Sequence, residues 1–383
     1  MIELARKLAG TLDRNPADII REALASAGIT INGDAPWDVQ IKDTRAYERM
    51  LRDGTLGVGE SYTEGWWDCQ ALDQMIVRAT RGRVDAVLGK SWALRAQVVR
   101  AHLFNVQAMR AFEVGERHYD VGNDLYREML GPRMIYTCAY FKNTDSLDAA
   151  QEAKLDLVCR KLGLQPGMRV LDLGCGWGGF AAFAAERYGV SVVGYTVSRE
   201  QVAWAKEHFA HLPVEVRLDD YRNATGTYDA VVSIGLMEHV GPKNHRAYME
   251  LAARCLAPGG VAFIHTIGAT SARTQIDPWF DKYIFPNAAI PTLGQLTTAM
   301  EGILVPEDVQ NIGPHYDRTL MLWWANFDEA WPRLRARYGD RFYRVWKYYL
   351  MASAAYFRAR ENNLYQIVAS PIGAAQPPTA RSS

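Results

Sequence analysis

Several features common in other classes of protein are missing from this 383-residue sequence. No run of 18 apolar residues occurs, and residues 1–10 mix charged and apolar side chains without the apolar core of a secretory leader. The five cysteines are an odd number without CxxC spacing, which indicates neither a disulfide framework nor a zinc ribbon. We therefore expect a cytoplasmic protein that is neither exported nor membrane-spanning, and we predict no metal site.

The sequence also lacks an excess of either charge, since 43 Lys and Arg residues balance 43 Asp and Glu residues. No global field draws such a chain to nucleic acid or to a membrane, so any affinity of that kind has to come from local patches. Two segments with a helical pattern are basic: seven basic residues accompany two acidic ones in 72–112, and eight accompany one in 331–360. Each is either a solvated helix face or a docking surface for anionic phospholipid.

From about residue 165, short runs rich in β-branched residues alternate with helical stretches. The runs are 169–173, 190–195, 214–218, 228–234 and 261–266, with a last one at 364–368. Apolar runs of this kind suit strands that are buried on both faces of a parallel sheet. We therefore predict an α/β fold with a Rossmann-like, doubly wound and mostly parallel sheet, whose ligands bind at the carboxyl ends of the strands.

The rest of the chain divides around this sheet. Residues 1–110 are mainly helical in pattern and are predicted to form a smaller accessory domain. Residues 111–370 are predicted to form the catalytic domain, including a linking segment and two aromatic-rich helices at 320–337 and 340–360. The tail 371–383 is rich in proline and small residues and is predicted to be disordered.

A glycine-rich segment, LDLGCGWGGF (171–180), follows the first predicted strand and opens a helix. Its glycines satisfy the GxGxxG spacing, which lets a ligand approach the backbone at a helix N-terminus. A dinucleotide site also needs an acidic residue at the end of the second strand, and residues 194–198 there contain none. With Asp172 two residues before the first glycine, the segment resembles the first motif of S-adenosylmethionine-dependent methyltransferases. An NAD site or a purely structural turn are the alternatives.

Eight ordered segments narrow the resemblance to one family. They are HYDVGNDLY (118–126), IYTCAYF (135–141), LDLGCGWGGF (171–180), VVGYTVSREQ (192–201), MEHVGPKNHRAY (237–248), IHTIG (264–268), DPWFDKYIFPN (277–287) and NIGPHYDRTLMLW (311–323). Together they resemble the bacterial cyclopropane-fatty-acyl-phospholipid synthases. A further segment, LGVGESYTEGWWDC (56–69), is similar to the extra N-terminal domain of the full-length enzymes, so the resemblance spans about residues 35–370.

The resemblance implies a methyl transfer from S-adenosylmethionine to the cis double bond of an acyl chain in a membrane phospholipid. Attack on the methyl group leaves a carbocation, and loss of a proton from the new methyl group closes the three-membered ring. In this family a bound bicarbonate takes the proton. Motif matching places its cradle at Cys138, Glu238, His265, the Ile267 backbone and Tyr316. Imidazole, phenol and N–H donors suit an oxyanion in a dry pocket, although ordinary packing is an alternative for each side chain.

The same resemblance implies the residues that contact S-adenosylmethionine. They are Tyr136 and Thr137 at the amino-acid end, Asp172, Gly174 and Gly176 at the cationic end, Thr196 and Gln201 at the ribose, and Asp219 and Asp220 at the adenine edge. Asp172 offers charge there, while the two glycines leave room for the cofactor.

The sequence also allows functions other than cyclopropane synthesis. A C-methyltransferase of unsaturated acyl chains fits the same fold, because the same cation can lose a different proton. A catalytically silent lipid-binding protein is the alternative from another class, and nucleic acid is not an expected partner. The resemblance also implies a homodimer that acts peripherally at the inner face of the membrane, with the accessory domain guiding docking or dimerisation.

Overall fold

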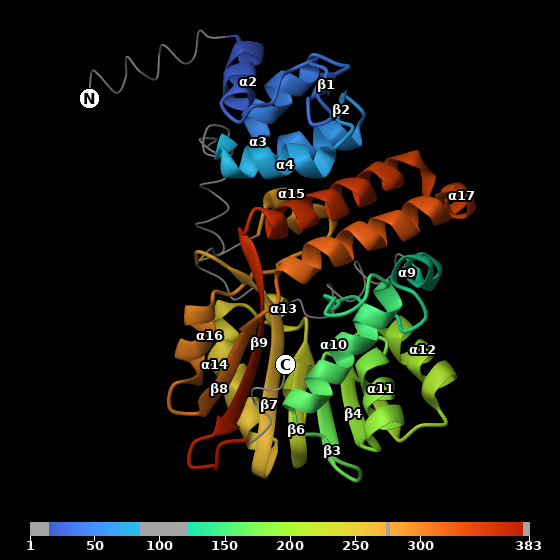
Figure 1. Ribbon diagram of the computed structural model, residues 1–383, viewed down its shortest axis with the longest axis vertical. Helices are drawn as coiled ribbons and strands as arrows, with labels where there is room; N and C mark the ends of the chain where they lie inside the picture. The colour runs from blue at the N-terminus through green and yellow to red at the C-terminus, as the bar shows by residue number, and fades with distance from the viewer. Residues whose placement is uncertain (1–14, 85–121, 273–275, 378–383) are drawn as a thin grey trace.

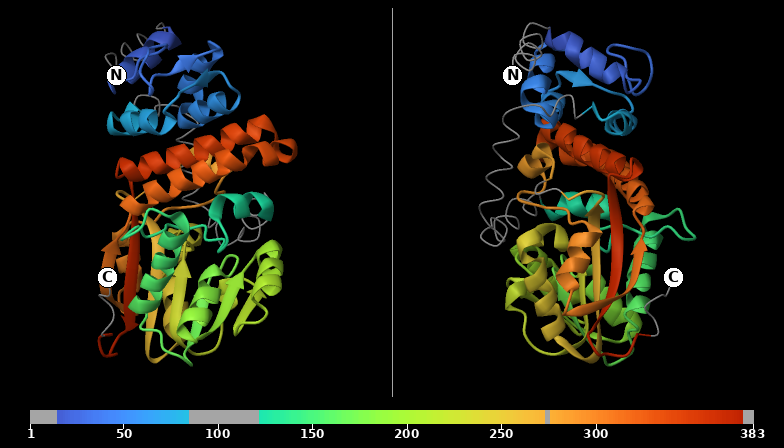
Figure 2. Two further views of the ribbon diagram at one scale, coloured as in Figure 1. Left: turned by 45° about the vertical axis from the view of Figure 1, so that its right-hand side comes forward. Right: turned by 90° about the vertical axis from the view of Figure 1, so that its left-hand side faces the viewer.

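The computed structural model describes residues 15–84, 122–272 and 276–377, which lie in three tiers along the long axis of the molecule (Figure 1). The N-terminal helices form one end, a long helical hairpin crosses the middle, and a helix-covered sheet forms the other end (Figure 2). The sheet carries the site described below, so its strand order decides which loops meet.

The sheet has seven strands in the order β5-β4-β3-β6-β7-β9-β8. Their bounds are β3 Arg169–Leu173, β4 Ser191–Thr196, β5 Val214–Leu218, β6 Tyr228–Ile234, β7 Leu256–Ala269, β8 Leu304–Asn311 and β9 Asn362–Pro371. β5, β4, β3, β6 and β7 are parallel to one another, whereas β9 runs antiparallel to both β7 and β8. The central strands are buried on both faces. The prediction of a mostly parallel, Rossmann-like sheet is confirmed.

The antiparallel edge is the part of the sheet that the sequence pattern missed. β8 was not predicted, because Val305 and Val309 are about 40% exposed and Pro306 marks a slip in the strand register. Such a strand belongs to an edge, where proline is tolerated and apolar runs are short. β9 is longer than its predicted run 364–368, and Pro371, which we assigned to the tail, pairs with Leu304. Residues 378–383 lie outside the described residues.

Helices cover both faces of the sheet. Their bounds are α9 Asn123–Leu130, α10 Leu147–Lys161, α11 Gly179–Tyr188, α12 Arg199–Phe209, α13 Met237–Val240, α14 His245–Arg254, α15 Pro278–Tyr283 and α16 Leu293–Met300, with 3₁₀ turns at Tyr221–Asn223 and Pro242–Asn244. α10 and α11 pack on one face, and α14 and α16 on the other (Figure 1). α10 starts where the Ser146 side chain accepts from Ala149 N, the usual signature of a capped first turn. Both α9 and α10 lie in the predicted linking segment, about residues 111–165, for which the sequence analysis gave no helix.

The helical hairpin is α17, Pro314–Arg358, which reverses direction at Gly339. Gly339 has φ 76° and ψ 158°, a conformation that a residue with a side chain adopts only with strain. The two arms correspond to the predicted helices 320–337 and 340–360. They pack through aromatic rings, with Trp331 and Phe327 at 5.0 and 5.8 Å from Tyr343.

Residues 15–84, the described residues of the N-terminal part, form three helices and one short ribbon. α2 is Pro16–Ala25, α3 Arg45–Thr63 and α4 Leu72–Arg81, and β1 (Gln40–Ile41) pairs antiparallel with β2 (Trp67–Asp68). The helix predicted from residue 72 is confirmed as far as α4 reaches. Its predicted continuation over 85–112 lies outside the described residues.

α3 of the N-terminal part packs tightly on α15. A side chain at Gly59 would overlap the Trp279 ring, so glycine allows the two helices to approach. The neighbouring Glu60 is buried, and its Oε1 accepts from Lys282 Nζ at 2.5 Å and from the Tyr283 hydroxyl at 2.9 Å. Its other oxygen pairs with Arg49. Glu60 is therefore the main polar anchor between α3 and α15.

We predict that Glu60→Gln lowers the free energy of unfolding by about 2 kcal/mol, because buried hydrogen bonds to a charged group lose their charge. Urea or thermal unfolding would measure the loss. The matched control is Glu64→Gln, whose carboxylate pairs with Arg341 on the surface and should change stability by no more than about 0.5 kcal/mol. Equal effects of the two substitutions would contradict the anchoring role.

Candidate functional site

The glycine-rich segment forms a tight turn between β3 and α11. Gly174 and Gly176 have φ values of 81° and 56°, which favour glycine. The N–H groups of Gly174 and Cys175 both donate to Tyr195 O, which fixes the turn against the end of β4. The Cys175 side chain packs where a side chain at Gly194 would stand, so it fills buried space.

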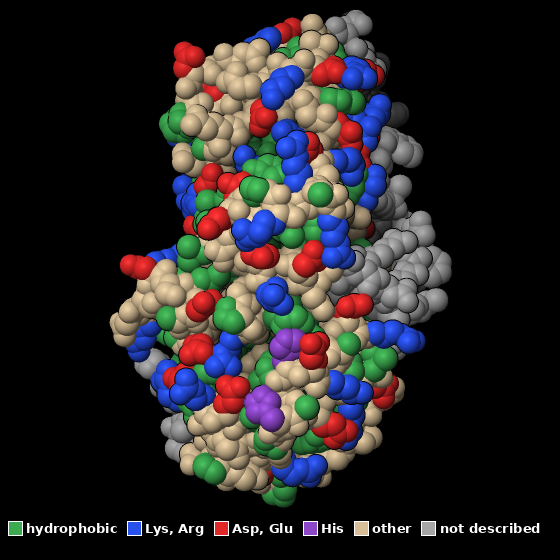
Figure 3. Space-filling model, turned by 90° about the vertical axis from the view of Figure 1, so that its right-hand side faces the viewer, with side chains coloured by type: hydrophobic (Ala, Val, Ile, Leu, Met, Phe, Trp, Pro, Cys, Tyr) green, Lys and Arg blue, Asp and Glu red, His purple; other side chains and the backbone are tan. Residues whose placement is uncertain are grey.

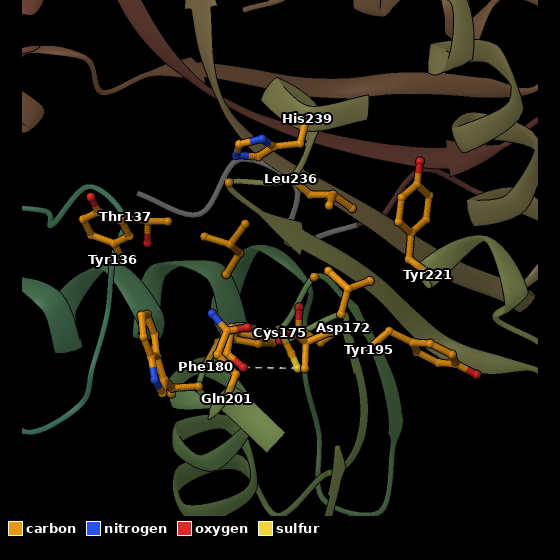
Figure 4. A pocket seen from close by; sticks show the side chains of 18 of the residues that line it. Tyr136, Thr137, Asp172, Cys175, Phe180, Tyr195, Gln201, Tyr221, Leu236 and His239 are labelled. Carbon is orange, nitrogen blue, oxygen red and sulfur yellow. Dashed lines mark hydrogen bonds between the residues drawn. The ribbon is translucent and has the colours of Figure 1, made fainter. Parts of the chain in front are cut away.

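A single pocket opens above this turn at the carboxyl edge of the sheet (Figure 4). Its walls include all nine residues that the sequence assigned to a cofactor: Tyr136, Thr137, Asp172, Gly174, Gly176, Thr196, Gln201, Asp219 and Asp220. They come from the loop before α10 and from the ends of three strands, so segments far apart in the sequence converge on one cavity.

The pocket also contains residues that the sequence analysis missed. They are Lys154 from α10, Leu236 and His239 around α13, and Pro286 and Asn287 after α15. In Figure 4, His239 lies across the pocket from Cys175 of the glycine turn. Leu236 lies closer to the turn, since a side chain at Gly174 would contact it. The sequence contains a signal that Lys154 is buried. Lys154 lies four residues after Ala150 and four before Val158, which places it on the apolar stripe of α10.

Hydrogen bonds fix the pocket residues that were predicted to contact the ribose and the adenine edge. Thr196 Oγ1 lies 2.5 Å from Gln201 Oε1 and also accepts from Ser198 N, at the capped start of α12. Asp220 is paired with Arg222, while Asp219 accepts from the Asp220 backbone N–H. Both aspartates therefore have partners in the protein, and both line the pocket.

Two opposite charges are buried in the wall of the pocket. Asp172 is 2% exposed, and burial raises the pKa of its carboxyl to about 7, although the Lys154 charge opposes this shift. Lys154 is 1% exposed, and burial lowers the pKa of its ammonium to about 8. Asp172 Oδ1 has no hydrogen-bond partner in the described structure. An unpartnered buried carboxylate oxygen facing a cavity is suited to a ligand with a positive group.

Glu238 and Ile267, two of the predicted cradle residues, are joined directly. Glu238 Oε1 accepts from Ile267 N at 2.7 Å, which connects α13, after β6, to the end of β7. Burial raises the pKa of the Glu238 carboxyl to about 7 despite this hydrogen bond. Its other oxygen, Oε2, is buried without a partner in the described structure.

His265 lies two residues before Ile267 in β7 and is fully buried. Its Nδ1 lies 3.3 Å from the amide nitrogen of Gln366. Since an amide NH₂ only donates, Nδ1 accepts and the neutral ring carries its proton on Nε2. Burial, followed by the charges of Lys154 and Lys161, lowers the pKa of His265 well below its usual value, so the ring is neutral. Nε2 has no partner in the described structure.

Cys138 lies in the loop before α10, and Tyr316 lies in the first turn of α17. The loop that carries Cys138 is fixed to the start of α17, because Ala139 N donates to Thr319 Oγ1 and Phe141 N donates to His315 Nδ1. Tyr316 belongs to the same turn of α17 and stacks on Phe357 at 4.6 Å. Burial raises the pKa of the Cys138 thiol, so Cys138 is not a thiolate nucleophile.

These residues fit a small oxyanion such as bicarbonate. Glu238 Oε2 and His265 Nε2 are buried polar atoms without protein partners, and one accepts or shares a proton while the other donates. Orphaned buried polar atoms are costly unless a ligand or water completes them. Glu238 Oε2 and His265 Nε2 are therefore the two atoms of the predicted cradle that a ligand could complete.

A parallel sheet with a glycine turn after its first strand, an aspartate at that strand's end and a pocket over the carboxyl edge defines a Rossmann-like methyltransferase of the S-adenosylmethionine-dependent class. The family model for mycolic acid cyclopropane synthetase matches residues 106–367. The chain therefore belongs to this family of cyclopropane synthases.

Individual relatives agree with this family. The chain is 46% identical over 359 residues to the cyclopropane-fatty-acyl-phospholipid synthase of Escherichia coli K12, covering 94% of each chain. The cyclopropane synthase MmaA2 of Mycobacterium tuberculosis has a similar structure, with 32% identity and a TM-score of 0.63 over 67% of this chain and 97% of its own. The structure of mycolic acid cyclopropane synthase CmaA1 complexed with SAH and CTAB is also similar, with 33% identity and a TM-score of 0.63. The match covers 67% of this chain and 97% of the CmaA1 chain.

We predict that Glu238 makes stability depend on pH. A carboxyl whose pKa is higher in the folded than in the unfolded state contributes stability that is complete below the unfolded value and lost as the pH rises through the folded one. For Glu238 this window runs from 4.5 to about 7. Across it, the unfolding free energy of the wild type should fall relative to Glu238→Gln by roughly 3 kcal/mol.

Urea titrations at several pH values would measure this difference. Glu250→Gln, which removes an exposed carboxyl on α14, should follow the wild type. Parallel curves for wild type and Glu238→Gln would show that Glu238 is not buried as a charge-sensitive group.

Proposed function

We propose that this protein is a cyclopropane-fatty-acyl-phospholipid synthase, which transfers a methyl group from S-adenosylmethionine to the cis double bond of a phospholipid acyl chain and closes a cyclopropane ring. The observation that carries the proposal is the convergence of a nine-residue cofactor wall and the Glu238–Ile267 cradle at one edge of the sheet. The relative that covers 94% of the chain supports the same activity.

The roles of the side chains follow from their surroundings. The glycine turn and Asp172 bind the cofactor, which supplies the methyl group. Glu238 and the His265 Nε2–H hold bicarbonate, which supplies a base for the final deprotonation when it is bound. Because His265 is neutral and the Cys138 thiol is protonated, neither is an anionic nucleophile that would trap a carbocation. Their burial also keeps water from the reacting carbons.

Aromatic rings connect the pocket to the helical hairpin. His239 in the pocket wall contacts Phe285 at 5.9 Å, and Phe285 contacts Tyr349 of α17 at the same separation. Tyr349 in turn shares a hydrogen bond with Tyr136 at 2.8 Å. Such rings stabilise positive charge and pack against acyl chains. They support an unsaturated lipid as the acceptor.

We place the protein at the membrane surface. Within the described residues, no helix has the length and apolar character needed to cross a bilayer. Arg78 and Arg81 of α4 line a shallow groove with Arg358, Ser26 and Gln74. Within the same residues, neither Arg78, Arg81 nor Arg83 forms an ion pair with a carboxylate. Unneutralised arginines of this kind support contact with lipid phosphate.

The other basic segment, 331–360, is a poorer candidate. Six of its eight basic residues form ion pairs with carboxylates, several of them from distant segments: Arg333, Arg335, Arg337, Arg341, Arg344 and Arg358. Figure 3 likewise shows Lys and Arg side chains intermixed with Asp and Glu over one whole face of the molecule. The solvated-face alternative therefore suits this helix, and the N-terminal part is the proposed docking module. A homodimer remains a prediction from the family.

The first test uses methyl-labelled S-adenosylmethionine and liposomes of unsaturated phospholipid, with the acyl chains analysed by mass spectrometry and proton NMR. We expect label in a cyclopropane methylene. Glu238→Gln should bind S-adenosylhomocysteine nearly as the wild type does but lose at least about 100-fold in turnover. Label in a methyl branch would establish C-methylation without ring closure, and absence of label with bound cofactor would overturn the lipid substrate.

The second test concerns docking. Reversal of Arg78, Arg81 and Arg83 to Glu should weaken cosedimentation with anionic liposomes at least about tenfold, because each basic residue near the surface contributes about 1 kcal/mol. The matched control reverses Arg187, Arg199 and Lys206, three exposed residues of α11 and α12, and changes the net charge by the same amount. Equal binding of the two triple variants would rule out a specific docking face.

A further inference from the structure

Lys154 is a buried lysine that the proposed reaction leaves without a role. It lies in the middle of α10, is 1% exposed, and lines the cofactor pocket. Its Nζ donates to Thr137 Oγ1 at 3.0 Å. Within the described residues, that hydroxyl is its hydrogen-bond partner, and no carboxylate pairs with it. Burying an ammonium group without an ion pair is expensive, so packing alone does not account for it.

A second lysine on the same helix shows what a structural lysine looks like here. Lys161 is also 1% exposed, but its Nζ pairs with Asp308 Oδ2 at 2.9 Å and lies outside the pocket. α10 therefore carries one buried lysine whose charge is balanced within the protein and one whose charge faces a cavity.

The bond between Lys154 and Thr137 also orients a hydroxyl. An ammonium group only donates, so Thr137 Oγ1 accepts and its own proton is left to donate elsewhere. Thr137 lines the pocket beside Tyr136 (Figure 4). Lys154 and Thr137 together present an ammonium charge and an O–H donor, which is the chemistry that binds a carboxylate.

Asp172 supplies the opposite charge in the same pocket. Its carboxylate oxygen Oδ1 is buried without a partner, and it forms no ion pair with Lys154 although each influences the other electrostatically. A cation and an anion held apart in one cavity wall are complementary to a zwitterion. The amino-acid end of S-adenosylmethionine is such a zwitterion, with an ammonium and a carboxylate group on one carbon.

We propose that Lys154 is a cofactor-binding residue whose ammonium group, with the hydroxyl of Thr137, holds the carboxylate of the amino-acid end of S-adenosylmethionine, opposite Asp172. This inference rests on the proposed use of that cofactor. It adds an anchor that discriminates ligands with the amino-acid end from ligands that lack it.

The test compares two ligands that differ only in that end. S-adenosylhomocysteine carries the amino acid, and 5′-methylthioadenosine keeps the adenine, ribose and sulfur without it. We expect Lys154→Met to raise the Kd for S-adenosylhomocysteine at least about 30-fold, the effect of removing one partner of a buried charge pair. The Kd for 5′-methylthioadenosine should change less than about threefold. Isothermal titration calorimetry of the full chain measures both.

Lys161→Met is the matched control, because it removes the other buried lysine of α10 and should leave both Kd values unchanged. Thermal unfolding without ligand verifies that each variant is folded, and Lys154→Gln provides a second variant if methionine is not accommodated. Equal weakening of both ligands, or no weakening of either, in the folded variants would overturn the role of Lys154. Wild-type protein that binds neither ligand would overturn the proposed function as well.

Discussion

The candidate site depends on one hydrogen bond between β7 and the helix that follows the neighbouring β6, from Ile267 N to Glu238 Oε1. Parallel strands place the residues that follow them at a common edge, but they leave the loops free to separate. This bond ties α13 to the end of β7, two residues beyond the buried His265. The same edge carries the glycine turn after β3 and Thr196 at the end of β4. The cofactor wall and the polar cradle are therefore two parts of one edge.

Several buried groups with unmet hydrogen-bonding capacity lie at this edge. Asp172, Glu238 and His265 each have a buried polar atom without a partner in the described structure, and Lys154 has a charge without a counter-ion there. Burial brings the pKa values of Asp172, Glu238 and Lys154 to about 7, 7 and 8. Burying each of these groups costs folding free energy. A ligand that forms the missing hydrogen bond or ion pair with the group offsets that cost. The same feature that lowers stability would thus favour binding of the proposed zwitterionic and anionic ligands.

The sequence predicted the parallel strands of the sheet better than its antiparallel edge. β3 and β6 have the predicted bounds, because strands buried on both faces need continuous apolar runs. β5 also has its predicted bounds, although it is an edge strand and only partly buried. β8 was not predicted, because one of its sides faces solvent and Pro306 interrupts the apolar pattern.

The nine residues predicted to contact the cofactor lie in recognisable motifs, and they line one pocket in the structure. Lys154 has no motif, and a lysine in a helix is read as a surface residue unless its place on the apolar stripe is considered.

The N-terminal part is physically continuous with the site, although none of the pocket residues belongs to it. Glu60 binds Lys282 and Tyr283 of α15, and Asp281 of the same helix accepts from Asn287 N, which holds the following turn. That turn supplies Pro286 and Asn287 to the pocket, and Ala289 N just beyond it donates to the Glu238 backbone oxygen. The N-terminal part, proposed to dock on lipid at α4, therefore rests on the segment that supports Glu238. If the proposed docking and cradle roles hold, this contact gives a structural reason for the N-terminal domain, since both regions share α15 as a common support.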